Sequence, residues 1–97
     1  MIVLTKSPKA QKKWRASFPD GAHVDFGARG YSDYTIHGDP QRMRRYVARH
    51  ARGGETWTRA GLKTPGFWAR WLLWSRPSIE EAVRFMEKRF GLVIRRR

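Results

Sequence analysis

The side chains that most often carry catalysis are few and scattered in this sequence. Three histidines are present, at His23, His37 and His50. No two of them have the His-x-x-x-His spacing of a zinc site, and the chain has no cysteine to add a metal ligand or a thiol nucleophile. The aspartates match no arrangement that pairs an acid with a base or a nucleophile. The sequence therefore predicts no catalytic residue, no metal site and no cofactor, and we expect a protein that is not an enzyme.

Arginine is the residue type whose spacing points most clearly to binding. Lys and Arg together number 21 against 8 acids, which gives a net charge of +13. Such a charge attracts polyanions, including nucleic acid. We expect a polyanion-binding helix face and a basic C-terminal tail, made respectively by Arg42, Arg44, Arg45, Arg49 and Arg52 and by Arg95, Arg96 and Arg97.

The helix-face arginines repel one another, because like charges three and four residues apart weaken a helix. No acid lies among them in the sequence. Two explanations remain open at this stage. A polyanionic partner could offset the repulsion, or acids from elsewhere in the fold could neutralise the face, for which Glu80, Glu81 and Glu87 are the candidates.

The tryptophans also allow two interpretations. Aromatic side chains between basic residues can stack on exposed nucleic-acid bases. At helical spacing they more often form a hydrophobic core, and we favour the core for most of them. A helix that is apolar on most sides can still leave aromatic surface for a protein partner. The candidates for such a protein interface are Trp57, Trp68 and Trp74.

Turn and cap signals place the elements that must position these residues. Alternating apolar residues on either side of Pro19-Asp20-Gly21 predict a β-hairpin over residues 14–26. Asp39-Pro40 predicts the start of the arginine-rich helix, and Thr64-Pro65 the start of a tryptophan-rich helix over residues 66–75. Ser78 with Glu81 three residues later predicts a third helix by the capping-box pattern, ending at Gly91.

These elements predict an α+β fold in which the hairpin packs on two or three short helices around a Trp-rich core. The single globular domain is expected over residues 13–94, with a terminal strand at Leu92–Ile94 extending the sheet. Residues 1–12 are expected to form a flexible N-terminal segment and residues 95–97 a basic tail. The longest apolar cluster, residues 67–74, is interrupted by Arg70 and too short to span a bilayer, so we expect a soluble protein without a membrane span.

Two strings carry a resemblance to a known group of proteins. These are F-G-x-x-G-Y-S-D-Y-T-x-H within residues 26–37 and G-F-W-x-R-W-L-L-W within residues 66–74. With the segments around residues 44–50 and 77–90, the chain resembles a family of short, basic, uncharacterised proteins encoded by nucleocytoplasmic giant DNA viruses of algae and protists. The resemblance covers about residues 12–91, and this chain departs from it mainly in its higher content of Arg and Ala and in its Arg95–Arg97 tail.

The resemblance implies a viral context and carries over no catalytic residue. It implies a virion-associated structural protein, a minor capsid or genome-contacting component, located in the virion and in the host cytoplasm or nucleus during infection. Its expected partners are capsid or other virion proteins and double-stranded DNA. The alternative function is a small nucleic-acid-binding accessory protein that acts through phosphate contacts.

Overall fold

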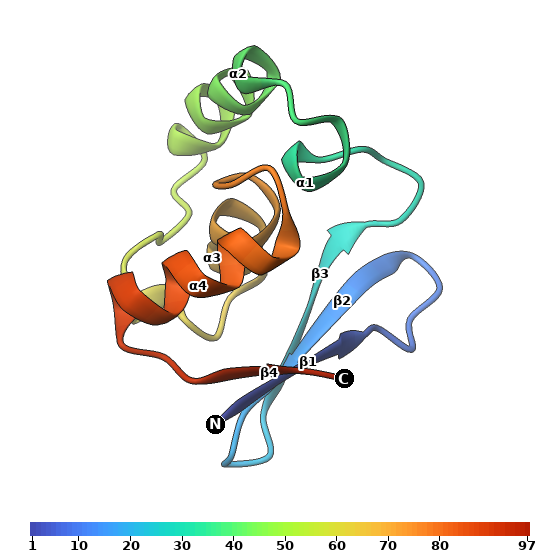
Figure 1. Ribbon diagram of the computed structural model, residues 1–97, viewed down its shortest axis with the longest axis vertical. Coiled ribbons are helices and arrows are strands. Elements are labelled where there is room, and N and C mark those ends of the chain that lie inside the picture. Colours follow the sequence, from blue (N-terminus) through green and yellow to red (C-terminus); the bar gives the residue numbers. More distant parts are fainter.

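A four-stranded sheet forms one side of the molecule. Its strands are β1 (Ile2–Lys6), β2 (Lys12–Ser17), β3 (His23–Ala28) and β4 (Ile94–Arg96). They stand in the order β3-β2-β1-β4, with β2 antiparallel to both neighbours and β4 parallel to β1. The structure is a computed structural model that describes all 97 residues. Figure 1 shows the helices gathered on one side of this sheet.

The helical elements are short and lie between β3 and β4 in the chain. They are α1 (Tyr34–His37), α2 (Pro40–Ala51), the 3₁₀ turn η1 (Arg59–Gly61), α3 (Pro65–Trp68), the π-helical turn η2 (Ala69–Leu73) and α4 (Ile79–Phe90). The predicted α+β fold is confirmed. None of these helices is long and apolar enough to cross a membrane.

The predicted caps are present. The Asp39 carboxylate accepts a hydrogen bond from the backbone N–H of Gln41 at 2.9 Å and begins α2. The Thr64 hydroxyl accepts from the Phe67 N–H at 3.4 Å, and the Ser78 hydroxyl accepts from the Glu81 N–H at 3.2 Å. Each side chain satisfies a backbone donor that the first helical turn leaves free.

The tryptophan-rich helix differs from the prediction in its geometry. It begins as the α-helix α3 and continues directly as the π-helical turn η2. Hydrophobic periodicity cannot distinguish the two, because this segment is apolar on most of its sides. Wide π turns of this kind are rare and recur next to functional sites.

Trp68 lies at the centre of the core. Its side chain is fully buried, and its ring stacks on Phe26 with the ring centroids 5.7 Å apart. Phe18 and Phe67 meet it edge to face, and its indole N–H donates to the Leu62 carbonyl at 2.7 Å. The Trp-rich core is therefore confirmed, but Trp68 is wrong as a protein-interface residue because no part of it reaches the surface.

The N-terminal segment is part of the domain, which corrects the prediction of a flexible segment over residues 1–12. β1 lies inside the sheet, hydrogen-bonded to β2 on one side and to β4 on the other. Leu4 is fully buried and Ile2 almost so. A strand of only five residues carries little pattern of its own, and its two partners come from distant parts of the chain.

The C-terminal arginines do not form a separate tail either. The terminal strand is confirmed but lies further along the chain than Leu92–Ile94, so that Arg95 and Arg96 belong to β4. Arg96 forms an ion pair with Glu80 on α4 at 2.9 Å. The backbone N–H of Arg97 donates to the Leu4 carbonyl at 3.0 Å, which extends the pairing to the last residue.

An ion pair ties the hairpin together on the face of the sheet away from the Trp68 core. Asp25 on β3 lies opposite Arg15 on β2 and accepts two hydrogen bonds from its guanidinium, at 2.9 and 3.1 Å. The Ser7 hydroxyl donates to the same carboxylate at 2.7 Å. The bond from Arg15, followed by that from Ser7, outweighs the desolvation of Asp25 and lowers its pKa from 3.8 to about 2.

We expect Asp25→Asn to destabilise the fold. At neutral pH the change should lower the free energy of unfolding by about 1–3 kcal/mol, because it leaves Arg15 without its charged partner. The folded pKa lies below the unfolded value, so the stabilisation is present above about pH 4 and is lost as the pH falls towards 2. Urea unfolding across this range should show a smaller acid-induced loss in the variant than in the parent.

Asp20→Asn is the matched control. Asp20 is exposed and its one ion pair, with Lys63, lies at the surface, so its substitution should cost much less stability than that of Asp25. An equal loss of stability in the two variants would contradict the structural role of Asp25.

Candidate functional site

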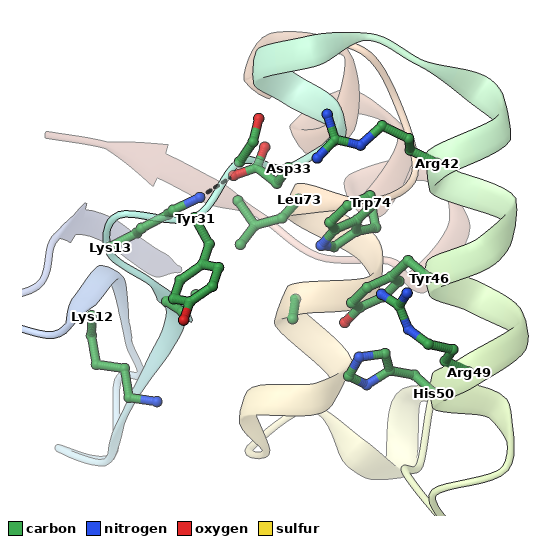
Figure 2. A pocket seen from close by; sticks show the side chains of 14 residues that line it. Lys12, Lys13, Tyr31, Asp33, Arg42, Tyr46, Arg49, His50, Leu73 and Trp74 are labelled. Atoms are coloured by element: carbon green, nitrogen blue, oxygen red, sulfur yellow. Dashed lines mark hydrogen bonds and ion pairs between the residues drawn. The ribbon is translucent and has the colours of Figure 1, made fainter.

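A cleft of about 430 Å³ opens between α2, the end of the hairpin and η2. Figure 2 shows Lys12 and Tyr31 on one wall, with Tyr46, Arg49 and His50 facing them from α2 on the other. Small and apolar residues from β3 and η2 line the base of the cleft: Gly27, Ala28, Ala69 and Leu73. The volume lies within the range of about 300–1,000 Å³ typical of ligand pockets.

The base of the cleft depends on a glycine. Gly27 has a backbone φ of +79°, and a Cβ atom there would lie 2.9 Å from the Leu73 side chain. Only glycine combines this conformation with such close packing. β3 and η2 can therefore pack closely against one another, and this contact connects the two walls of the cleft.

A stack of aromatic rings supports the α2 wall. Tyr46 is the one buried side chain of α2, and its ring lies parallel to that of Trp74, with an interplanar angle of 3° and centroids 4.4 Å apart. His50 stacks on the other face of Tyr46 at 4.1 Å. Burial is the main cause that raises the pKa of the Tyr46 hydroxyl, so this group stays protonated and neutral. The stack fixes α2, and the arginines it carries, against η2.

The positive charge of α2 is not neutralised within the molecule. The four arginines of α2 and Arg52 at its C-cap form no ion pair, and all five are exposed. Of the two explanations that the sequence leaves open, neutralisation by the acids of α4 does not occur in the structure. Glu80 pairs with Arg96, Glu81 accepts from the Ser78 hydroxyl, and Glu87 accepts from the Ile94 N–H.

The remaining acids are engaged elsewhere as well. Glu55, the acid that follows α2 in the chain, contacts His50 Nδ1 at 2.8 Å and accepts from the Trp57 indole at 3.0 Å. Asp33 is buried and pairs with Lys13 Nζ at 2.6 Å, so that these two charges of the cleft cancel. The cations left free around the cleft are those of Lys12, Arg42 and Arg49.

The structure brings together only part of the predicted polyanion-binding set. Arg42 and Arg49 line the cleft, whereas Arg44 and Arg45 on α2 and Arg52 at its C-cap are exposed outside it. The arginines of the C-terminal strand, at residues 95–97, lie at the far edge of the sheet from β3 and away from α2 (Figure 1). The basic surface is therefore two separate regions.

The predicted protein-interface tryptophans also separate. Trp74 lines the cleft through its stack with Tyr46. Trp57 is half-buried in a second groove with Trp71 and Phe90, and its carbonyl accepts from the Trp71 indole at 2.7 Å. The sequence offers no means of separating these roles, because all three tryptophans lie close together in the chain.

Lys12, Lys13 and Tyr31 belong to the cleft but are absent from the predicted site. Lys12 pairs with Ala28 in the hairpin register, which brings it to the loop that carries Tyr31. The register follows from the predicted hairpin, so extending the hairpin by two residue pairs at its open end would place Lys12 next to this loop. Nothing in the sequence indicates that α2 would form the opposite wall.

A half-buried arginine lies against Trp71 and Trp74. Arg70 donates to the Trp74 carbonyl at 2.7 Å and covers the Trp71 ring, with the guanidinium carbon 4.3 Å from the ring centroid. Burial lowers its pKa from the ordinary value. Its Nε is buried without a hydrogen-bond partner. We assign Arg70 to the support of η2, since cation–π contact and a backbone bond account for its position.

The histidines lie apart in the structure. His23 is near Asp25 on the sheet, His37 accepts from the Asp39 N–H, and His50 contacts Glu55. No group of three His, Asp or Glu side chains is placed to hold a metal ion. The arrangement of the cleft thus favours binding of an anionic ligand by side-chain cations and aromatic surface.

Comparisons with known proteins give one match. No curated protein and no solved structure matches the chain significantly. A family model matches residues 2–50, just over half of the 97 residues, and this region includes β1 to β3 and nearly all of α2. It therefore contains both side walls of the cleft, with Lys12, Tyr31, Arg42, Tyr46 and Arg49. The chain belongs to the family of unknown function DUF5754.

Proposed function

We propose that this protein binds nucleic acid through phosphate contacts made by α2 and the cleft, and that it is not an enzyme. One observation carries the proposal: the four arginines of α2 and Arg52 at its C-cap are exposed without a single acidic partner. Arginine guanidinium groups bind phosphate oxygens in a bidentate manner. A phosphate backbone beside α2 would relieve their mutual repulsion, which the fold itself leaves in place.

Cations lie on both sides of the cleft. This arrangement favours a chain of phosphates as the ligand over a single small anion. Lys12 projects from the hairpin wall and Arg49 from α2, on opposite sides of the cleft (Figure 2). Arg44, Arg45 and Arg52 continue the positive surface beyond the cleft along the same helix. A polymer with regularly spaced charges can meet cations that are spread over such a length.

The second candidate function is a structural role in a virion. We propose the virion because of the resemblance to giant-virus proteins. The observation that favours a protein partner is the second groove, of about 400 Å³, lined by Trp57, Trp71 and Phe90 beside Arg89. Tryptophan and arginine are enriched where protein interfaces bind most tightly. In this proposal the groove contacts a capsid or other virion protein while the cleft faces the packaged DNA.

We expect Arg42→Gln combined with Arg49→Gln to weaken binding of duplex DNA and to reduce its dependence on salt. Each lost phosphate contact lowers the slope of log affinity against log salt concentration by about 0.9, so the double variant should lose about 1.8. Fluorescence anisotropy of a labelled random duplex, measured over a series of salt concentrations, gives this slope directly.

The matched control removes two charges elsewhere. Arg84 and Lys88 are exposed on α4 without an ion pair, and changing both to Gln gives the same net charge as the double variant. This control should keep most of the parental slope. An equal effect of the two double variants would mean that the overall charge alone drives binding, and the absence of duplex binding at low salt would overturn the proposal.

The virion setting has its own test. Quantitative proteomics of purified particles should find the protein at a fixed number of copies relative to the major capsid protein. Its absence from particles, with the protein present in infected cells, would overturn the virion role and leave the nucleic-acid proposal standing.

A further inference from the structure

Tyr31 is the one exposed aromatic side chain in the protein. It is 75% exposed, while the other twelve aromatic side chains are buried or half-buried. A turn closed by the bond from the Tyr31 N–H to the Ala28 carbonyl, with Gly30 at φ +92°, holds its backbone beside the hairpin. Its ring projects at the cleft opening, across from Tyr46 and His50 (Figure 2).

The cleft therefore combines three kinds of surface that a simple phosphate site does not need. An exposed ring stands on one wall, a stack of one buried and two half-buried rings forms the other, and the floor of the cleft between them is apolar. Phosphate binding is satisfied by cations and N–H donors alone. A flat, partly apolar group that is linked to phosphates matches all of these surfaces at once.

An unpaired nucleobase is such a group. Bases in a duplex are stacked on one another, and only their edges reach the grooves. Bases in a single strand expose their π faces, and proteins that bind single strands stack them on aromatic side chains beside a positively charged groove. The free cations of Lys12, Arg42 and Arg49 lie around the cleft, where phosphates on either side of an inserted base would pass.

We propose that the cleft binds single-stranded nucleic acid, with an unpaired base inserted between the two walls and stacked on Tyr31. This inference rests on the proposed nucleic-acid function and adds the strand type and the stacking residue. DNA and RNA both offer an unpaired nucleobase with flanking phosphates. The experiment therefore also compares the two sugars.

The test compares four labelled probes of equal charge and length with the parental protein and its variants. The probes are a short oligodeoxyuridylate, the matching oligouridylate, an abasic strand that keeps the phosphates, and poly-glutamate. The two strands with bases should bind at least about five-fold more tightly than the abasic strand, since one stacked base contributes about 1–3 kcal/mol. The deoxyuridylate and uridylate strands differ only in the sugar, so a difference in affinity between them identifies the preferred sugar.

Tyr31→Ala should abolish the preference for strands with bases while leaving affinity for the abasic strand unchanged. Tyr31→Phe should retain the preference, because stacking needs the ring and not the hydroxyl. Ile36→Ala is the matched control, since Ile36 is 66% exposed on α1 and does not line the cleft. Thermal unfolding followed by circular dichroism should show all three variants folded, because both side chains are mainly in solvent.

The outcomes separate this inference from the proposed function. Equal binding of intact and abasic strands, or an unchanged preference in Tyr31→Ala, would overturn base stacking while phosphate binding stands. Binding of poly-glutamate as tight as that of the oligonucleotides would show that the cleft prefers an acidic protein. No binding of any strand at low salt would overturn both proposals together.

Discussion

The packing of Trp68 against the sheet is the interaction on which the rest of the molecule depends. The indole stacks on Phe26 of β3 and joins the strands to the helical segment that contains it. Ala69 and Leu73 follow in the same segment and form the base of the cleft, and Trp74 continues it into the α2 wall. Deleting so large a buried ring typically costs about 3–5 kcal/mol, a large part of the stability of a small domain. The core and the cleft are thus built from consecutive residues of one helical segment.

The distribution of charge separates the surfaces that hold the fold together from the surface that we propose for binding. Acids are used where the fold needs them: Asp25 joins two strands, Asp33 neutralises Lys13, and Glu80 holds Arg96. With 8 acids for 21 basic residues, none is left to pair with an arginine of α2. The exposed positive helix is a destabilising feature in isolation. A bound polyanion removes that cost, which is why we connect this surface with function.

Local signals predict much of the fold. The turn at residues 19–21 and the caps at Asp39, Thr64 and Ser78 each satisfy nearby backbone groups, so a short window of sequence contains all of the information. Signals of this kind also place the five arginines on one helix. They carry no information about which distant segments of the chain pack against one another.

The features that the sequence does not reveal all depend on distant contacts. β1 pairs with residues 94–96 at the other end of the chain, so its place inside the sheet has no local pattern. Trp68 and Trp74 occur in the same apolar run, and only the packing of Phe26 and Tyr46 decides which one is buried and which lines the cleft. The cleft itself exists because β3 and η2 meet at Gly27. The candidate site therefore follows from the fold as a whole.

Nuclear magnetic resonance titration with an unlabelled oligothymidylate tests the central claim most directly. The account predicts that the largest chemical-shift changes fall on the residues of both walls of the cleft, including the Trp74 indole and the backbone amides of Tyr31 and Arg49. Shifts at the C-terminal arginines and on α4 should be small, because these surfaces lie away from the cleft. Shifts concentrated on β4 and α4, with the cleft unchanged at saturation, would contradict the account.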